Sequence, residues 1–136
     1  MKFVLIGSSP AVIGAVKAIR SKDQSAEIVF VGFDGHLPYD RARLSYFLAR
    51  KAKDKDVFVA AAEFFKMHNV TVILDKEVTR VNFGRRRVFL SDKQSLDYDV
   101  LVMADAPAVR LPNLKGIRRS GVFHLSRPEA VKGIAR

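Results

Sequence analysis

Cysteine is missing from this sequence of 136 residues, and its absence excludes several functions at once. Without thiols the chain has no disulfide framework and no thiolate metal site, so any thiol redox chemistry requires residues from outside this sequence. Histidine is scarce as well, and His36, His68 and His124 are scattered without the spacing of metal ligands. We therefore assign the chain no metal ligand and no catalytic residue.

Long apolar segments are also missing. No run approaches the roughly 20 apolar residues that span a membrane. Residues 1–6 contain a lysine and an apolar stretch too short for a secretory signal. We therefore expect no membrane partner and a cytoplasmic location. The apolar fraction of 49% and the charged fraction of 28% are ordinary for a globular protein of one domain.

Acidic residues are few relative to basic ones. The chain has 24 lysines and arginines against 14 aspartates and glutamates, which gives a formal net charge of +10. Such an excess attracts anions, whether nucleotide phosphates, nucleic acid or an acidic partner. The basic residues are spread along the chain, so ordinary solvated cations are the favoured explanation of the excess. No nucleic-acid-binding motif is present, and we rank nucleic acid last among the partners.

The order of apolar runs and glycines predicts an α/β fold. The runs at 3–6 and 28–31 end at Gly7 and Gly32, as expected for strands buried on both faces. Between them, Ser9 as N-cap and Pro10 as first helical residue predict a helix to about residue 20. Such a unit has parallel strands, and we expect an open sheet with helices on both faces. Further strands are expected at 70–74, 100–103 and 122–125, further helices at about 41–51, 60–67 and 128–134, and an antiparallel meander at 78–83, 87–90 and 96–98.

The turn after the first strand stands where phosphates bind in dinucleotide-binding folds, because backbone N–H groups and a helix N-terminus meet there. The fingerprint G-x-G-x-x-G aligns with residues 7–12, in which only Gly7 is a glycine. Ser9 replaces the second glycine and is expected to crowd a phosphate or to bond it through its hydroxyl. Val12 replaces the third and is expected to push the helix outward. Asp34 follows the second strand at a separation suited to a ribose ligand, although a simple turn residue explains it as well.

The stretch from His36 to Leu48 reads H-L-P-Y-D-R-A-R-L-S-Y-F-L. It resembles the H-L-P-Y-x-R-x-x-L-S-x-x-L segment of the pyridine nucleotide-disulphide oxidoreductase family, which includes NADH oxidases, rubredoxin reductases and the reductase part of nitrite reductases. Residues 96–102 are similar to the family's L-x-Y-D-x-L-V ending, and the similarity extends over the chain. The resemblance implies a Rossmann-like FAD/NAD(P)-binding three-layer fold with a parallel sheet and a small antiparallel β-meander.

The resemblance also implies a function. Residues 1–136 would be a single, partial FAD-binding domain of an NAD(P)H-dependent flavin oxidoreductase, truncated or completed by another chain. FAD would be the cofactor, with its pyrophosphate at the first turn, its ribose at Asp34 and its adenine at the backbone of Val78. A homodimer or a second polypeptide would complete the fold. The cofactor-binding residues that the resemblance implies are Gly7, Ser8, Ser9, Pro10, Asp34, Arg41, Ser45, Val78, Ala104 and Asp105.

Departures from the family pattern keep a second hypothesis open. The family's A-T-G reads Ala104-Asp105-Ala106 here, and a carboxylate facing the cofactor would repel its phosphates. Ser9 and Val12 stand at former glycine positions in the same region. These changes favour a non-catalytic nucleotide-binding or protein-interaction module that has lost flavin binding. The first turn alone is also typical of an ordinary strand-to-helix connection.

Overall fold

The computed structural model describes residues 1–32, 35–74, 76–104 and 110–135. The chain forms two units, and each is built from two separate segments. The first unit contains Met1–Tyr39 and Val59–Ala106, and the second contains Asp40–Phe58 and Pro107–Arg136.

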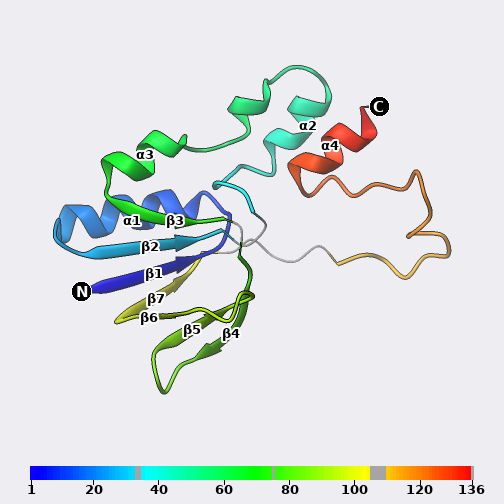
Figure 1. Cartoon of the computed structure of the whole chain (residues 1–136). Helices are drawn as coiled ribbons and strands as arrows, with labels where there is room; N and C mark the ends of the chain where they lie inside the picture. The colour runs from blue at the N-terminus through cyan, green and yellow to red at the C-terminus, as the bar shows by residue number, and fades with distance from the viewer. Residues whose placement is uncertain (33–34, 75, 105–109, 136) are drawn as a thin grey trace. The chain divides into compact units, whose positions relative to one another are not determined.

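Four parallel strands form the central sheet of the first unit (Figure 1). They are β1 (Lys2–Ile6), β2 (Glu27–Val31), β3 (Val70–Ile73) and β7 (Val100–Met103), and their order across the sheet is β3-β2-β1-β7. The chain moves outward from β1 to β2 and β3, and returns on the other side of β1 with β7. These four strands confirm the prediction of a mostly parallel sheet.

Two helices cover one face of this sheet, α1 (Ala11–Lys22) and α3 (Ala62–Met67) (Figure 1). Alternate strand residues point toward them, and the ring of Phe30 stacks on that of Phe65 with 5.4 Å between centroids. Burying one such aliphatic or aromatic side chain contributes about 1.5–3 kcal/mol. The buried residues of this core are Leu5, Val12, Ile13, Val16, Ala26, Ile28, Phe30, Phe65, Val70 and Ala104.

An antiparallel sheet covers the other face of the parallel sheet. It consists of β4 (Val78–Asn82), β5 (Arg87–Leu90) and β6 (Ser95–Asp97) in the order β4-β5-β6, which confirms the predicted meander. The prediction of helices on both faces is wrong, because the meander supplies the apolar side chains that this face needs (Figure 1). The buried residues of this second core are Val4, Ile6, Val29, Val31, Val88, Leu90 and Tyr98.

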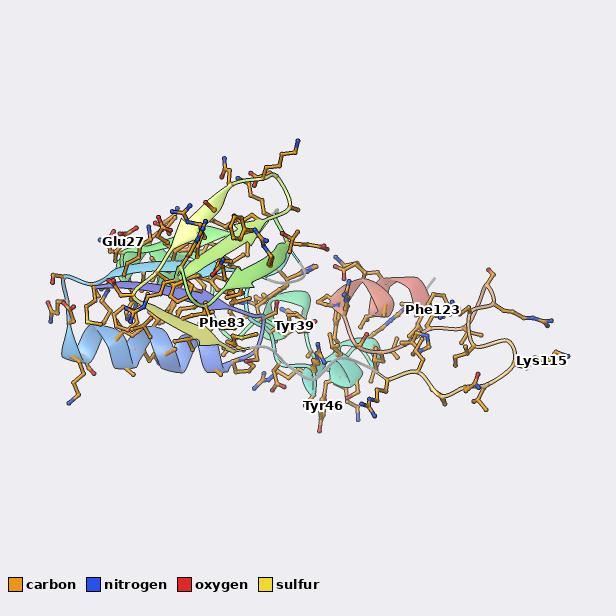
Figure 2. The ribbon with its side chains drawn as sticks, turned by 90° about the horizontal axis from the view of Figure 1, so that it is seen from below. Glu27, Tyr39, Tyr46, Phe83, Lys115 and Phe123 are labelled. Atoms are coloured by element: carbon orange, nitrogen blue, oxygen red, sulfur yellow. The ribbon has the colours of Figure 1, made fainter. Side chains whose placement is uncertain are left out.

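The described residues of the second unit form two short α-helices and one 3₁₀ turn. Helix α2 (Arg43–Leu48) packs against α4 (Pro128–Ile134), and η1 (Asp54–Asp56) closes the first segment of the unit. Figures 1 and 2 both show α2 and α4 side by side. The bounds of α4 are those predicted from the sequence.

The strand predicted at 122–125 is wrong, because these residues form no strand in the structure. Their backbone groups bond locally instead: Val122 N–H donates to Arg119 O over 3.1 Å, and Ser126 N–H to His124 O over 2.8 Å. The side chain of Phe123 lies so close to Gly133 of α4 that a Cβ at Gly133 would come within 2.8 Å of the ring. Packing on a helix therefore replaces pairing with a strand.

Two helices are shorter than predicted. Helix α2 starts at Arg43 instead of residue 41, since the Asp40 carboxylate accepts the Ala42 N–H over 3.0 Å, and the left-handed φ of 57° at Arg50 follows its end. Helix α3 starts two residues later than predicted, at Ala62. No helix among the described residues has the length and apolar character that crossing a membrane requires.

Candidate functional site

The carboxyl ends of β1 and β7 mark the candidate site. In open α/β sheets, ligands bind beyond the carboxyl ends of the strands, at the point where the strand order reverses. The reversal here falls between β1 and β7, because β2 follows on the opposite side of β1. The β1–α1 turn (residues 7–10) follows β1, and Ala104 follows β7. Five of the predicted cofactor-binding residues therefore meet at this edge.

Ser9 joins the two strand ends. Its hydroxyl donates to the carbonyl oxygen of Ala104 over 2.6 Å, and its N–H donates to the same oxygen over 3.3 Å. Its Oγ also accepts the N–H of Ala11 over 3.3 Å. Helix α1 begins at Ala11, one residue later than predicted, and Pro10 occupies the capping position. The alignment with the glycine fingerprint did not predict this bond between the turn and β7.

The backbone donors at the start of α1 decide what the turn can bind. The Val12 N–H donates to Ser9 O over 3.2 Å and the Ile13 N–H to Pro10 O over 3.1 Å, while Pro10 has no N–H. The Ala11 N–H donates to the Ser9 Oγ, and rotation of the Ser9 side chain would break this bond. The first turn of α1 holds no acidic residue that would neutralise the positive end of the helix dipole. The turn thus fits a phosphate oxygen at Ala11 once Ser9 rotates away.

The other two fingerprint positions have contrasting environments. Gly7 has a φ of 138°, which side-chain-bearing residues rarely adopt, and its N–H donates to Val31 O over 3.1 Å. Val12, at the third glycine position, is completely buried in the core between α1 and the sheet. The interface between helix and sheet therefore accommodates its side chain.

The H-L-P-Y segment runs along the same edge. The Tyr39 N–H donates to Ser8 O over 3.1 Å, and the buried Tyr39 ring, labelled in Figure 2, meets the ring of His36 edge-on at 6.2 Å. A Cβ at Gly32 would lie 2.8 Å from the carbonyl oxygen of His36. Gly32 thus permits this close approach, a role that was not predicted, although a glycine directly after a strand is a usable signal.

The other predicted residues are Val78, Arg41, Ser45, Asp34 and Asp105. Val78 begins β4, and the register between β4 and β5 shifts between Val78 and Arg80. Arg41 and Ser45 belong to the second unit, where the Ser45 hydroxyl donates to Ala42 O over 3.1 Å. Asp34 and Asp105 lie outside the described residues.

Shifted pKa values occur away from this edge. Hydrogen bonds from Arg87 lower the pKa of Asp97, and those from Lys76 lower the pKa of Asp92, both in the meander region. The hydroxyl of Ser25 lowers the pKa of Asp23 in the turn before β2. Within the described parts of the chain, no three His, Cys, Asp or Glu side chains gather as metal ligands would. The start of α1, with the Ala11 N–H and no acid in its first turn, supports the binding of an anion.

A three-layer α/β fold with a turn of this kind at the strand-order reversal defines a Rossmann-like protein of the FAD- and NAD(P)-binding class. The sequence profile of the pyridine nucleotide-disulphide oxidoreductase family matches residues 1–136, and the chain belongs to this family. Both results confirm the resemblance seen in the sequence.

Curated relatives are considerably longer than this chain. Rhodocoxin reductase of Rhodococcus erythropolis is 32% identical over 126 residues, a match that covers 92% of this chain and 30% of the reductase. NADH oxidase of Lactococcus lactis is 28% identical over 130 residues, which is 92% of this chain and 29% of the oxidase. The chain thus spans less than a third of the length of these relatives.

Solved structures show the same relation. An NAD-dependent persulfide reductase from A. fulgidus is 27% identical, with a TM-score of 0.88 over 98% of this chain and 27% of the reductase. Putidaredoxin reductase in its covalent complex with putidaredoxin is 26% identical, with a TM-score of 0.82 over 99% of this chain and 33% of that protein.

Proposed function

We propose that this chain is the FAD-binding portion of an NAD(P)H-dependent flavin oxidoreductase. The observation that carries the proposal is the turn at the strand-order reversal, where the N-terminus of α1 presents an N–H held only by a rotatable side chain. Bound FAD would supply the transfer of electrons between NAD(P)H and an acceptor, while the protein supplies placement. The cytoplasmic location and the single partial domain expected from the sequence remain predictions.

The proposed roles follow the positions of the residues. Gly7, Ser8, Ser9 and Pro10 would border the pyrophosphate, with the Ala11 N–H as its donor, and Ala104 would border the cofactor from β7. The other proposed contacts are Asp34 with the ribose, Val78 with the adenine, Arg41 and Ser45 with the flavin and the pyrophosphate, and Asp105 beside Ala104.

The decisive experiment is retention of FAD after incubation and desalting, followed by visible absorbance. We expect flavin bands in the wild-type chain and their loss in Ala11→Glu, because a carboxylate in the first turn repels phosphate. The same substitution suits the helix dipole and stabilises α1 by about 0.3–1 kcal/mol, so the fold is preserved. Ala18→Glu makes the same charge change on the exposed side of the same helix and should retain FAD. A colourless wild-type sample would contradict the proposal.

A second candidate function rests on the N–H groups of Ser9, Val12 and Ile13, which all bond within the chain. Few donors then remain for a pyrophosphate, as expected for a nucleotide-binding or interaction module without flavin. Thermal shift with FAD, ADP and NADH, each added separately, distinguishes the two candidates. Stabilisation by ADP without stabilisation by FAD supports the module.

Further polypeptide is the proposed partner of this unit, either as another part of the protein or as a second chain. The support is the coverage of less than a third of the relatives, together with β7 at one edge of the parallel sheet. Met103, the last residue of β7, is 67% exposed. An edge strand of this kind offers unpaired backbone groups to a neighbour.

A further inference from the structure

The charge of the chain is divided unequally between its two units. The second unit contains 13 of the 24 lysines and arginines but 4 of the 14 acidic residues, so it carries +9 of the formal charge of +10. The first unit is close to neutral. The excess that looks evenly spread along the sequence is therefore concentrated in one part of the fold.

Five of these cations form what we call the basic patch, Arg43, Arg50, Lys51, Lys53 and Lys55. All five side chains are exposed. The chain folds back on itself here, because the N–H groups of Lys51 and Ala52 donate to Tyr46 O over 2.9 and 3.2 Å. The Arg43 guanidinium reaches Asp56 O over 3.3 Å and brings the two ends of the segment together.

A cavity of about 430 Å³ opens within the basic patch, lined by Asp40, Ala42, Arg43, Tyr46, Lys51 and Ala52. The Asp40 carboxylate is already engaged, since its Oδ1 accepts the Ala42 N–H and its Oδ2 lies 3.8 Å from the Arg43 Nε. Lys51 makes no ion pair within the described parts of the chain. Tyr46 adds an exposed aromatic ring, which Figure 2 shows pointing away from the ribbon.

We propose that the basic patch and its cavity dock an acidic, amphipathic polypeptide, with a carboxylate of the partner between Arg43 and Lys51. None of the proposed cofactor-binding residues lines the cavity, although Arg41 and Ser45 adjoin residues that do. A second copy of the chain is disfavoured, since two units of +9 repel each other.

Exposed aliphatic side chains decide between a polypeptide and a nucleic acid. Proteins that bind single-stranded nucleic acid combine basic residues with aromatic rings on which bases stack. The second unit exposes two aromatic rings, Tyr46 and Phe123, among its described residues. It also exposes aliphatic side chains outside the cavity, which suit the apolar side chains of a polypeptide. Among the described residues, the large exposed aliphatic side chains of this unit are Leu111, Leu114, Val122, Leu125 and Ile134.

The test measures binding of three probes to the 136-residue chain by fluorescence anisotropy. They are a helical peptide of Glu and Leu, a peptide of Lys and Leu in the same pattern, and a single-stranded oligonucleotide. We expect the Glu/Leu peptide to bind best and to weaken with added salt, which screens charges beyond about 10 Å at 0.1 M. Equal or better binding of the oligonucleotide or of the Lys/Leu peptide overturns the proposal.

Charge reversal locates the site. The double variant Arg43→Glu with Lys51→Glu should lower the affinity for the Glu/Leu peptide by about tenfold or more. Arg85→Glu with Arg86→Glu changes the net charge equally at exposed positions of the first unit and should leave binding within about twofold. If the double variant does not fold, Lys51→Glu alone, at an exposed side chain, tests the same loss of affinity. The proposal is overturned if the two double variants lose affinity for the Glu/Leu peptide equally. It is also overturned if the Arg43/Lys51 variant loses none.

Discussion

Ser9 places a hydroxyl where the dinucleotide fingerprint has a glycine, and the oxygen of this hydroxyl accepts a hydrogen bond from the Ala11 N–H. We expect Ser9→Gly to bind FAD more tightly than the wild type, because the donor becomes free and no Cβ crowds the phosphate. One recovered hydrogen bond corresponds to about 0.5–1.5 kcal/mol, or about 2- to 10-fold in affinity. Ser9→Ala, which keeps the Cβ, should lie between them. Quenching of flavin fluorescence measures all three, and equal or weaker binding by Ser9→Gly would show that the hydroxyl helps to hold the phosphate.

Gly32 tests the close approach of the H-L-P-Y segment. A Cβ there would lie 2.8 Å from the backbone oxygen of His36 and 2.7 Å from Leu74 Cδ2, so Gly32→Ala forces the backbone to move. Such overpacking costs about 1–3 kcal/mol of folding stability. The matched control is Gly14→Ala, whose Cβ meets no atom within 4 Å and which should stabilise α1 by about 1 kcal/mol. Urea unfolding measures both, and equal shifts would contradict the packing argument.

At the scale of elements, the meander is tied together by a cross-strand ion pair. Arg87 of β5 and Asp97 of β6 are register partners, and the Arg87 Nη2 donates to Asp97 Oδ2 over 3.2 Å. Hydrogen bonds from Arg87 lower the pKa of Asp97 below its usual value of 3.8. Because the pKa is lowered on folding, the ion pair contributes its full stability at a pH above the usual pKa of 3.8. This contribution is lost as the pH falls through the pKa of the folded state.

Asp97→Asn should therefore be less stable than the wild type at neutral pH and equally stable in strong acid. Urea unfolding from neutral pH down to about pH 2 measures the difference between the two proteins. A difference that persists at the acid end would assign the effect to packing instead of charge. The exposed Ser95 of the same strand, changed to alanine, should show no such pH dependence.

The turn between α1 and β2 is fastened to the end of α3 by one side chain. The Arg20 guanidinium donates to His68 O and Ala26 O over 2.7 Å each, and to Asn69 O over 3.0 Å. We expect Arg20→Met to lose about 1.5–3 kcal/mol of stability, because bonds from a charged donor are among the stronger ones. Thermal unfolding measures this loss, and Lys22→Met on the exposed end of α1 is the control. An unchanged melting temperature in Arg20→Met would contradict the role.

Local patterns predicted α4 and all the strands that the structure contains, together with one at 122–125 that it does not, and they did not predict what covers the sheet. The apolar run at 100–103 and the Pro128 start of α4 depend on neighbouring residues alone. The cover of the second face depends on Val88 and Tyr98 meeting β1 and β2, a contact between distant segments. The bond from Ser9 to Ala104 joins residues 95 positions apart and was unpredictable for the same reason. The location of the site after the first strand was predictable from the sequence. The hydrogen bonds at the site depend on contacts between distant segments and were not.

At the scale of the whole molecule, the two units differ in the core that each contains. The buried apolar side chains of the second unit are Leu44, Val57, Pro128 and Val131, and all others among the described residues belong to the first unit. Regions with few buried apolar contacts open locally at a lower free energy. We expect amides of α2 and α4 to exchange with deuterium at least about tenfold faster than those of β1 and β2. Mass spectrometry measures this, and uniform protection would show that both units unfold together.

The position of β1 at the centre of the sheet has a consequence for synthesis. β1 is made before both of its neighbours, pairs with β2 once Val31 has been made, and pairs with β7 only after Met103. At roughly 5–20 residues per second, this interval lasts on the order of 4–14 seconds on the ribosome. During that time one edge of this strand, whose residues 3–6 are all apolar, lacks its partner, and such edges pair with other chains. The growing chain, more than the finished protein, is therefore the species that a chaperone has to protect.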